Sequence, residues 1–181
     1  YVNVEGKKGQ GSSDNVSGTQ LIQSAEDITG NGSEMGISNG YFMGKLYYNG
    51  AYIDFEINAQ EDVDDVILIL RLTPDLYDME FTEDTWQILV NDVKVSYGTL
   101  SLTGAVASAE GGEKTKRPFQ NYEIPVKISL KAGQNTIRLL TNNSENHGGT
   151  FNADTPLIDC IYLCTETELS WAECYPENVG Q

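Results

Sequence analysis

Amide, imidazole and carboxylate side chains are concentrated in residues 141–155, which read TNNSENHGGTFNADT. This stretch holds four asparagines, the only histidine of the chain and one aspartate. Amides donate and accept hydrogen bonds and carboxylates accept them, so the combination suits the binding of hydroxyl groups. It suits a solvated loop equally well. The candidate polar binding residues are Asn146, His147, Asn152 and Asp154.

A second set of candidate residues is aromatic and lies in residues 36–57, GISNGYFMGKLYYNGAYIDFEI. The end of this segment alternates apolar and acidic residues, which is the period-two pattern of a strand with one buried face. Tyr47 and Tyr48 fall at the turn before that strand, where side chains can point away from the core. They form either a binding platform or a lid over the end of the sheet, and we favour the platform. Packing in the core or on a sheet face is predicted for Tyr41, Tyr52 and Trp86.

No pattern of residues indicates catalysis. A glycosidase needs two carboxylates roughly 5–10 Å apart, and the acidic residues here are scattered through predicted edges and loops. The histidine has no serine or cysteine nucleophile motif around it. Cys160, Cys164 and Cys174 have the spacing C-x3-C-x9-C, which is not that of a zinc site. One disulfide that includes Cys174, with an unspecified partner, and three reduced thiols both remain open. We expect the chain not to be an enzyme.

The composition excludes two classes of partner. With 11 Lys and Arg against 27 Asp and Glu, the formal charge of the 181 residues is -16. Nucleic acid binding needs clustered basic residues, and an anionic membrane surface would repel the chain. The longest apolar run, VILIL at 66–70, is far shorter than the roughly 20 residues needed to cross a bilayer, so we expect no membrane insertion. The chain lacks an initiator methionine and reads as an excised part of a longer protein.

Strand patterns separated by turn residues recur along most of the chain. A two-residue hairpin is predicted at Asn91 and Asp92, and a turn at 131–133. Helical periodicity is almost absent, with one short turn each expected at 61–65 and 75–79. Eight or more short strands with few helices predict an all-β fold, a jelly-roll β-sandwich of two antiparallel sheets.

The predicted sandwich occupies residues 20–164. Residues 1–19 are expected to form an N-terminal strand and a linker, because 7–19 are rich in glycine, serine and polar residues. Residues 165–181 form a C-terminal extension that could double back as an added strand. Together with the N-terminal strand it would cover a sheet edge, which would otherwise invite aggregation.

Five motifs follow one another in a recognisable order: SAEDITG, NGYFMGKLYYNGAYIDFEI, VILILRL, FQNYEIPVKISLKAGQNTIRLL and PLIDCIYL. Together they resemble carbohydrate-binding modules of families six and thirty-five, the galactose-binding-like jelly rolls attached to secreted polysaccharide-degrading enzymes. The resemblance covers roughly residues 21–163. It implies a non-catalytic module that targets a secreted or cell-surface protein to a polysaccharide or oligosaccharide, beside other modules of the same parent chain, and therefore an extracellular location.

The resemblance also implies a structural calcium ion. Its ligands in the family come from the first strand and from the start of the last strand. The first-strand motif Glu-Ala-Glu reads Ser24-Ala25-Glu26 here, and the last-strand aspartate is matched by Asp159. Calcium takes about 6–8 oxygen ligands, so Glu26 and Asp159 would need backbone carbonyls and waters in addition. Ser24 stands where the family has a carboxylate. The alternative is that both acids simply lie at strand edges.

The family's sugar cleft is matched at one of three positions. Its second aromatic residue falls on Phe119, whereas Lys45 stands at or near the first aromatic position and Leu157 at the asparagine position. Leucine cannot hydrogen-bond a hydroxyl, so we expect the polar part of the site to come from residues 142–154. The predicted site lies between Phe119, Tyr47 or Tyr48, and this loop. A competing interpretation is a protein-adhesion or structural β-sandwich of a bacterial surface protein, because fold does not fix function.

Overall fold

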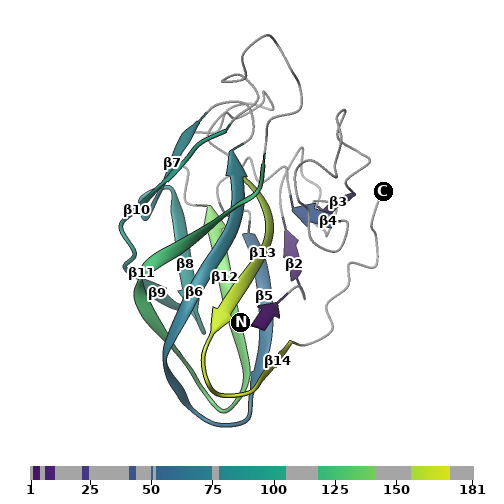
Figure 1. The fold of residues 1–181 in the computed structure, drawn as a ribbon, viewed down its shortest axis with the longest axis vertical. Helices are drawn as coiled ribbons and strands as arrows, with labels where there is room; N and C mark the ends of the chain where they lie inside the picture. Colours follow the sequence, from purple (N-terminus) through teal and green to yellow (C-terminus); the bar gives the residue numbers. More distant parts are fainter. Residues whose placement is uncertain are drawn as a thin grey trace.

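The structure is a computed structural model of the chain. It describes residues 50, 52–74, 78–104, 118–141 and 156–170, together with the strand backbone of residues 2–4, 7–10, 22–24, 41–43 and 171. Within these residues the secondary structure consists of strands, and every strand pair is antiparallel. The predicted all-β sandwich is confirmed (Figure 1).

Two six-stranded sheets form the layers of the sandwich. The first, here called the β6 sheet, contains β11 (Gln120–Leu130), β6 (Val63–Pro74), β13 (Pro156–Cys164), β4 (Tyr41–Met43) and β3 (Ile22–Ser24) in that order, with β1 (Val2–Val4) also on β13. The second, the β12 sheet, contains β14 (Leu169–Trp171), β5 (Tyr52–Ala59), β12 (Gly133–Thr141), β8 (Trp86–Val90) and β9 (Val93–Val95), with β2 (Lys7–Gln10) also on β5.

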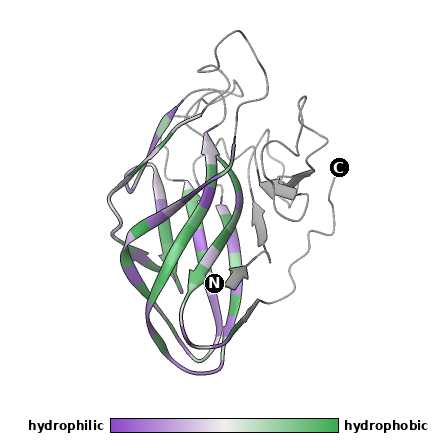
Figure 2. Ribbon diagram, viewed as in Figure 1, coloured by the Kyte–Doolittle hydropathy of each residue, from purple (hydrophilic) through white to green (hydrophobic). Residues whose placement is uncertain are grey.

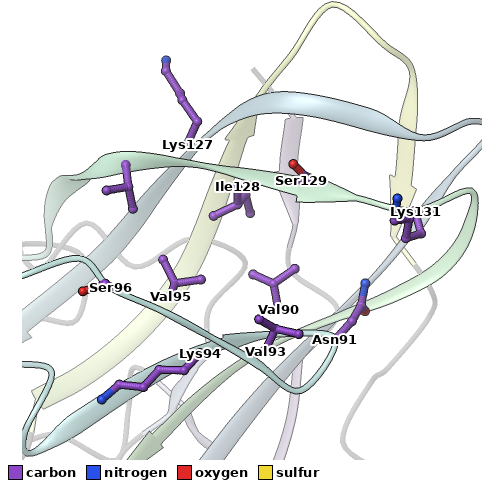
Figure 3. A pocket seen from close by; sticks show the side chains of 11 residues that line it. Val90, Asn91, Val93, Lys94, Val95, Ser96, Lys127, Ile128, Ser129 and Lys131 are labelled. Carbon is purple, nitrogen blue, oxygen red and sulfur yellow. The ribbon is translucent and has the colours of Figure 1, made fainter.

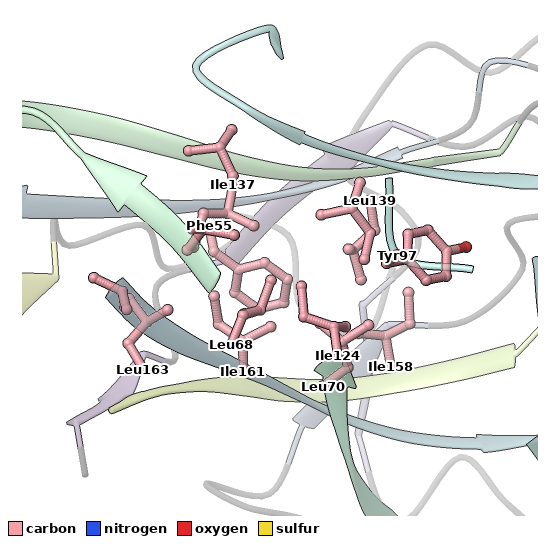
Figure 4. Packing of buried hydrophobic residues seen from close by; sticks show 14 of the residues in the cluster. Phe55, Leu68, Leu70, Tyr97, Ile124, Ile137, Leu139, Ile158, Ile161 and Leu163 are labelled. Atoms are coloured by element: carbon pink, nitrogen blue, oxygen red, sulfur yellow. The ribbon is translucent and has the colours of Figure 1, made fainter. Parts of the chain in front are cut away.

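The core lies between these sheets because their strands alternate apolar and polar residues. Figure 2 shows hydrophobic and hydrophilic residues interleaved along the described strands. On β5 the predicted apolar face is fully buried, and β12 shows the same alternation, whereas β6 is a central strand with a continuous apolar run at 66–70. Figure 4 shows side chains of both sheets in contact, including Phe55, Leu68, Ile137 and Leu139. Each such buried side chain contributes about 1.5–3 kcal/mol of hydrophobic stabilisation.

A third, two-stranded sheet formed by β7 (Met79–Thr82) and β10 (Thr99–Leu102) closes one end of the core. The Phe81 ring stacks on Trp86 with centroids 5.5 Å apart, and the Tyr97 ring packs against Phe81 in a tilted arrangement at 5.7 Å. Trp86 is therefore a core residue, as predicted.

Two predicted turns are confirmed. Asn91 and Asp92 have φ angles of 49° and 66° and join β8 to β9, the backbone of a tight two-residue hairpin. Gly133, with φ of 94°, starts β12 directly after β11 and its turn. The helical turn predicted at 61–65 is wrong: β6 already begins at Val63 there, and Asp65 reaches a φ of 57° within it. Its acidic residues mimic the start of a helix, but the apolar run that follows pairs as a strand.

The outer strands differ from the predicted boundaries at one point. Residues 7–10, predicted as linker, form β2 and pair with β5. Their glycine and lysine content hides a strand because an edge strand needs only its backbone to pair. The C-terminal extension does double back, as β14, on the same edge of β5. β1 lies on β13, so both terminal segments cover sheet edges as expected.

Candidate functional site

Several segments that carry predicted binding residues start or end at one end of the sandwich, uppermost in Figure 1. The main-chain nitrogen of Gly50, which follows the tyrosine pair in sequence, donates to the carbonyl of Thr141 at 2.9 Å. Thr141 is the last described residue before 142–155. On the far side of that segment, Pro156 begins β13 and is paired with Pro74 at the end of β6. Gly50, which follows the tyrosine pair, and Thr141, which precedes the asparagine-rich segment, are therefore neighbours.

Residues 103–104 and 118–120, which flank residues 105–117, lie at the same end of the sandwich. The Gln120 side chain donates from Nε2 to the carbonyl of Thr103 at 3.3 Å, which ties the start of β11 to the end of β10. A side chain on Gly104, whose φ is 94°, would meet the Pro118 ring at 3.3 Å. Glycine at position 104 therefore permits the backbone to lie close to the Pro118 ring. Described residues that flank three segments remote in sequence therefore lie at one end of the sandwich.

Phe119 lies at this end, on the outer face of the β6 sheet. Gln120 is paired with Leu72 and Leu157 with Thr73, so Phe119, Thr73 and Leu157 form a row across the sheet. All three are buried, and the exposed fraction of Phe119 is 5%. Phe119 is therefore packed rather than openly displayed, and its role in binding stays a prediction.

Arg71 occupies the next row on this face and joins three strands. Its Nε donates to Oδ2 of Asp159 at 3.0 Å, and its Nη1 donates to Oδ1 of Asn121 at 3.0 Å. The Asp159 carboxylate is fully buried, and a guanidinium is a cation that can offset the cost of burying it. Farther along β13, burial raises the pKa of the Tyr162 phenol to about 12.

Asp159 is the predicted calcium ligand whose side chain the structure describes. Glu26 lies outside the described residues, and Ser24 is described only as backbone paired with Tyr41 in β3 and β4. Among the described residues no group of three or more His, Cys, Asp or Glu is placed to hold a metal ion. Arg71 already supplies positive charge to Asp159. The described donors alone do not make up the 6–8 oxygens of a calcium site, so the ion stays a prediction.

Arg138 and Asp54 form a second ion pair, on the outer face of the β12 sheet. Arg138 donates from Nε to Oδ1 at 2.6 Å and from Nη2 to Oδ2 at 2.8 Å, a bidentate geometry. The hydrogen bonds from Arg138 to Asp54 raise the pKa of the guanidinium. Its Cζ lies 4.0 Å from the centroid of the Tyr52 ring. A face of that ring is thus covered, in agreement with the sheet-face packing predicted for Tyr52.

The other predicted binding residues lie outside the described residues: Tyr47, Tyr48, Asn146, His147, Asn152 and Asp154. Sequence patterns did not reveal the ion pairs of Arg71 and Arg138, because each joins residues more than 80 positions apart. Only the strand register identifies such partners. Cys160 and Cys164 are not joined to each other, and Cys174 is outside the described residues.

Solved structures of similar fold cover nearly the whole chain. A family 35 carbohydrate-binding module from an environmental isolate superposes with a TM-score of 0.56 at 19% identity, over 97% of this chain and 100% of that one. The family 35 module of Abf62 from Cellvibrio japonicus gives 0.57 at 15% identity, over 96% and 99%.

The fold is that of the family 35 carbohydrate-binding modules. A third structure of this fold, Xyl-CBM35 in complex with a glucuronic acid-containing disaccharide, gives 0.53 at 16% identity and covers 93% of this chain and 91% of that one. The predicted resemblance to family 35 is thereby confirmed at the level of structure. No protein-family model matches the sequence, and no curated protein matches it either. In the described part of the chain, no helix has the length and apolar character needed to span a membrane.

Proposed function

We propose that this chain is a non-catalytic carbohydrate-binding module, which binds a glycan at the loop end of its sandwich. The main support is that residues flanking the predicted binding segments lie together at that end. Gly50 is beside Thr141, and Pro156 is beside Pro74. Because these flanking residues are neighbours, we expect the segments with the paired tyrosines and the asparagines to share one surface. Aromatic rings stack on the C–H faces of sugars while amides bind their hydroxyls, and such a site needs both.

The proposed ligand is a neutral or weakly charged glycan. The formal charge of -16 disfavours uronic acid polymers, because carboxylates would repel one another unless a cation lies between them. The glucuronic acid-containing disaccharide bound by one protein of the same fold makes that class the necessary comparison. A glycan panel should therefore contain neutral and uronic acid sugars, each with and without calcium.

The module belongs to a secreted or cell-surface protein, which it targets to a polysaccharide, and other modules of the same parent chain are its neighbours. A structural calcium ion lies between Glu26, Ser24 and Asp159, where it shares the Asp159 carboxylate with Arg71. A calcium ion bound by Asp154 is a variant of this arrangement.

Affinity gel electrophoresis against the panel tests the function, and substitution tests the site. The Tyr47→Ala/Tyr48→Ala double variant should lose about tenfold or more in affinity, because each stacking contact contributes about 1–3 kcal/mol. Tyr162→Ala is the matched control, since Tyr162 pairs with Ile69 in the middle of the β6 sheet, away from the loop end. Phe119→Ala should also weaken binding, but it removes a buried ring. Its melting temperature must therefore be measured beside its affinity.

The possible outcomes are distinct. Binding that resists both the tyrosine double substitution and Phe119→Ala would place the site on another surface. No binding to any glycan, with calcium present, would overturn carbohydrate binding itself. The protein-adhesion or structural β-sandwich of a surface protein would then be the better account.

A further inference from the structure

A cavity of about 470 Å³ lies between the edge strands β9 and β11, at the side of the sandwich (Figure 3). Valine and isoleucine side chains form most of its walls, and no aromatic ring lines it. Figure 3 shows the side chains of Lys94 and Lys127 directed away from it. The cavity therefore lacks the flat aromatic surface on which a sugar stacks. Described residues at the loop end are better placed to contact a glycan.

Asn121 is an exposed polar residue at the loop end, on the outer face of the β6 sheet. It is the second residue of β11 and pairs with Arg71. Alternate residues of a strand point to the same face and lie about 6.5–7 Å apart. Asn121 is therefore the side chain that follows Phe119 on this face of β11.

The side-chain amide of Asn121 is oriented by Arg71. Nη1 of Arg71 donates to Oδ1 of Asn121 at 3.0 Å. A guanidinium has only donors, so the oxygen of the amide has to face it, and Nδ2 lies on the side away from Arg71. Among the residues that the structure describes, no acceptor receives a hydrogen bond from Nδ2. The amide thus holds a donor that a ligand can use.

A buried ion pair fixes the position of Arg71 in turn. Its Nε donates to Oδ2 of Asp159 at 3.0 Å, and the Asp159 carboxylate is fully buried. Movement of the guanidinium away from Asp159 would leave a buried charge uncompensated, which is costly. The direction of the Asn121 donor is therefore set before a ligand binds, and less side-chain freedom is lost on binding.

The row of Phe119 itself supplies no hydrogen-bonding side chain to a ligand. Leu157 is apolar, and the Thr73 hydroxyl is buried and donates to the carbonyl of Pro74 at 3.3 Å. A sugar needs hydrogen bonds to its hydroxyl groups as well as an aromatic surface. The adjacent row provides such a group in the amide of Asn121.

We propose that Asn121 is a glycan-binding residue of the loop-end site, where Nδ2 donates to a hydroxyl or ring oxygen of a sugar unit beside Phe119. Arg71 is a positioning residue, which acts on the glycan through the orientation of this amide. The inference rests on the proposed carbohydrate binding and adds a contact on the β6 sheet to the residues predicted from the sequence. The acceptor is an uncharged sugar oxygen, in keeping with a neutral glycan.

Affinity gel electrophoresis with soluble galactan, arabinoxylan, galactomannan and glucuronoxylan tests the role of Asn121. With the polymer that retards the unmodified chain most, Asn121→Ala should weaken binding about three- to tenfold, the loss expected for one hydrogen bond. Asn58→Ala is the matched control and should leave binding unchanged. Asn58 is also an exposed asparagine on a strand, but it pairs with Gln134 near the start of β12, whereas the loop end lies at the last residue of β12.

Melting temperatures and nuclear magnetic resonance show whether the contact is direct. Both asparagine variants lose an exposed side chain, so their melting temperatures should stay within about 3 °C of that of the unmodified chain. Oligosaccharides of the same polymer should shift the side-chain amide signal of Asn121. A signal that stays unchanged at saturation would overturn the contact.

Arg71→Lys tests the positioning role. Lysine keeps a positive charge beside Asp159 but lacks the planar fork with which arginine contacts two partners at once. It should therefore weaken binding where Asn121 is present and have no further effect in the Asn121→Ala background. A merely structural role of Arg71 would weaken binding by the same factor in both backgrounds, which would overturn the positioning role.

The results separate this inference from the function on which it rests. If the unmodified chain binds a polymer and Asn121→Ala binds it equally well, the assignment of Asn121 is wrong while carbohydrate binding stands. If the unmodified chain binds none of the polymers, the proposed function fails and the inference fails with it.

Discussion

Tyr97 donates its phenolic hydrogen to the main-chain carbonyl of Trp86 across 2.6 Å, and both side chains are buried beside Phe81. The phenol thus ties the segment after β9 to the start of β8. Burial, followed by the nearby charges of Glu83 and Asp84, raises the pKa of Tyr97 above its ordinary value of 10.0.

Stability should therefore fall at alkaline pH. Above pH 10 the unfolded chain releases the phenolic protons, whereas the folded chain retains that of Tyr162 to about pH 12 and that of Tyr97 beyond it. The unfolded state then binds fewer protons, so the free energy of unfolding decreases as pH rises. Tyr97→Phe should cost about 1–2 kcal/mol at pH 7 through the lost hydrogen bond. It should also reduce the further loss between pH 10 and 11.5, measured by urea melts. An equal alkaline loss in the variant would contradict this.

Asn135 should stabilise the fold more than its polar character suggests. It is 1% exposed, accepts hydrogen bonds from Asn91 Nδ2 and the Lys131 main-chain nitrogen at 2.8 Å, and donates to the carbonyls of Lys131 and Gly133. Asn135→Ala leaves several of these partners without a hydrogen bond, which should lower the free energy of unfolding by about 2–4 kcal/mol. Gln134→Ala, at the exposed neighbour, should stay within about 0.5 kcal/mol. Equal free energies of unfolding for the two variants would show that the turns at 91–92 and 131–133 do not depend on the hydrogen bonds of Asn135.

Ending the chain at Leu163 should destabilise it and lower its solubility. The truncation removes β14 and its buried Leu169, and it exposes the backbone of β5 opposite residues 169–171. Loss of a buried leucine costs about 2–5 kcal/mol, and an uncovered edge promotes aggregation. Leu169→Ala separates the two effects, since it should lower the melting temperature without promoting aggregation. A truncated chain that melts normally would make β14 dispensable.

Removal of calcium should lower the melting temperature by about 5–10 °C if the ion is bound, because a ligand at 100 times its Kd adds about 2.7 kcal/mol. Melts with excess EDTA and with added calcium measure this. Glu26→Gln should abolish the difference, since it removes a proposed ligand. A melt that EDTA leaves unchanged would mean that the buried charge of Asp159 needs no calcium ion in addition to its ion pair with Arg71.

The sequence predicted most of the sandwich because local patterns determine it. The alternation on β5 and the turn at Asn91 and Asp92 depend on neighbouring residues alone, and both are found as expected. β2 was missed because its pairing uses backbone groups, which composition does not reveal. For the candidate site, sequence could indicate suitable residue types. It could not show that Phe119 is buried, since that depends on packing across β6 and β13.

Only two residues separate Val4 from Lys7, yet β1 pairs with one sheet and β2 with the other. This short crossing joins the sheets through main-chain hydrogen bonds on one side of the sandwich. On the opposite side, β9 and β11 pair only within their own sheets among the described strands. A second short crossing lies on that side, because β11 of one sheet is joined to β12 of the other by Lys131 and Ala132 alone. β9 has no such crossing, since its hairpin returns to β8 of its own sheet. We therefore expect the amide hydrogens of β9 to exchange with solvent earlier than those of β5 and β13.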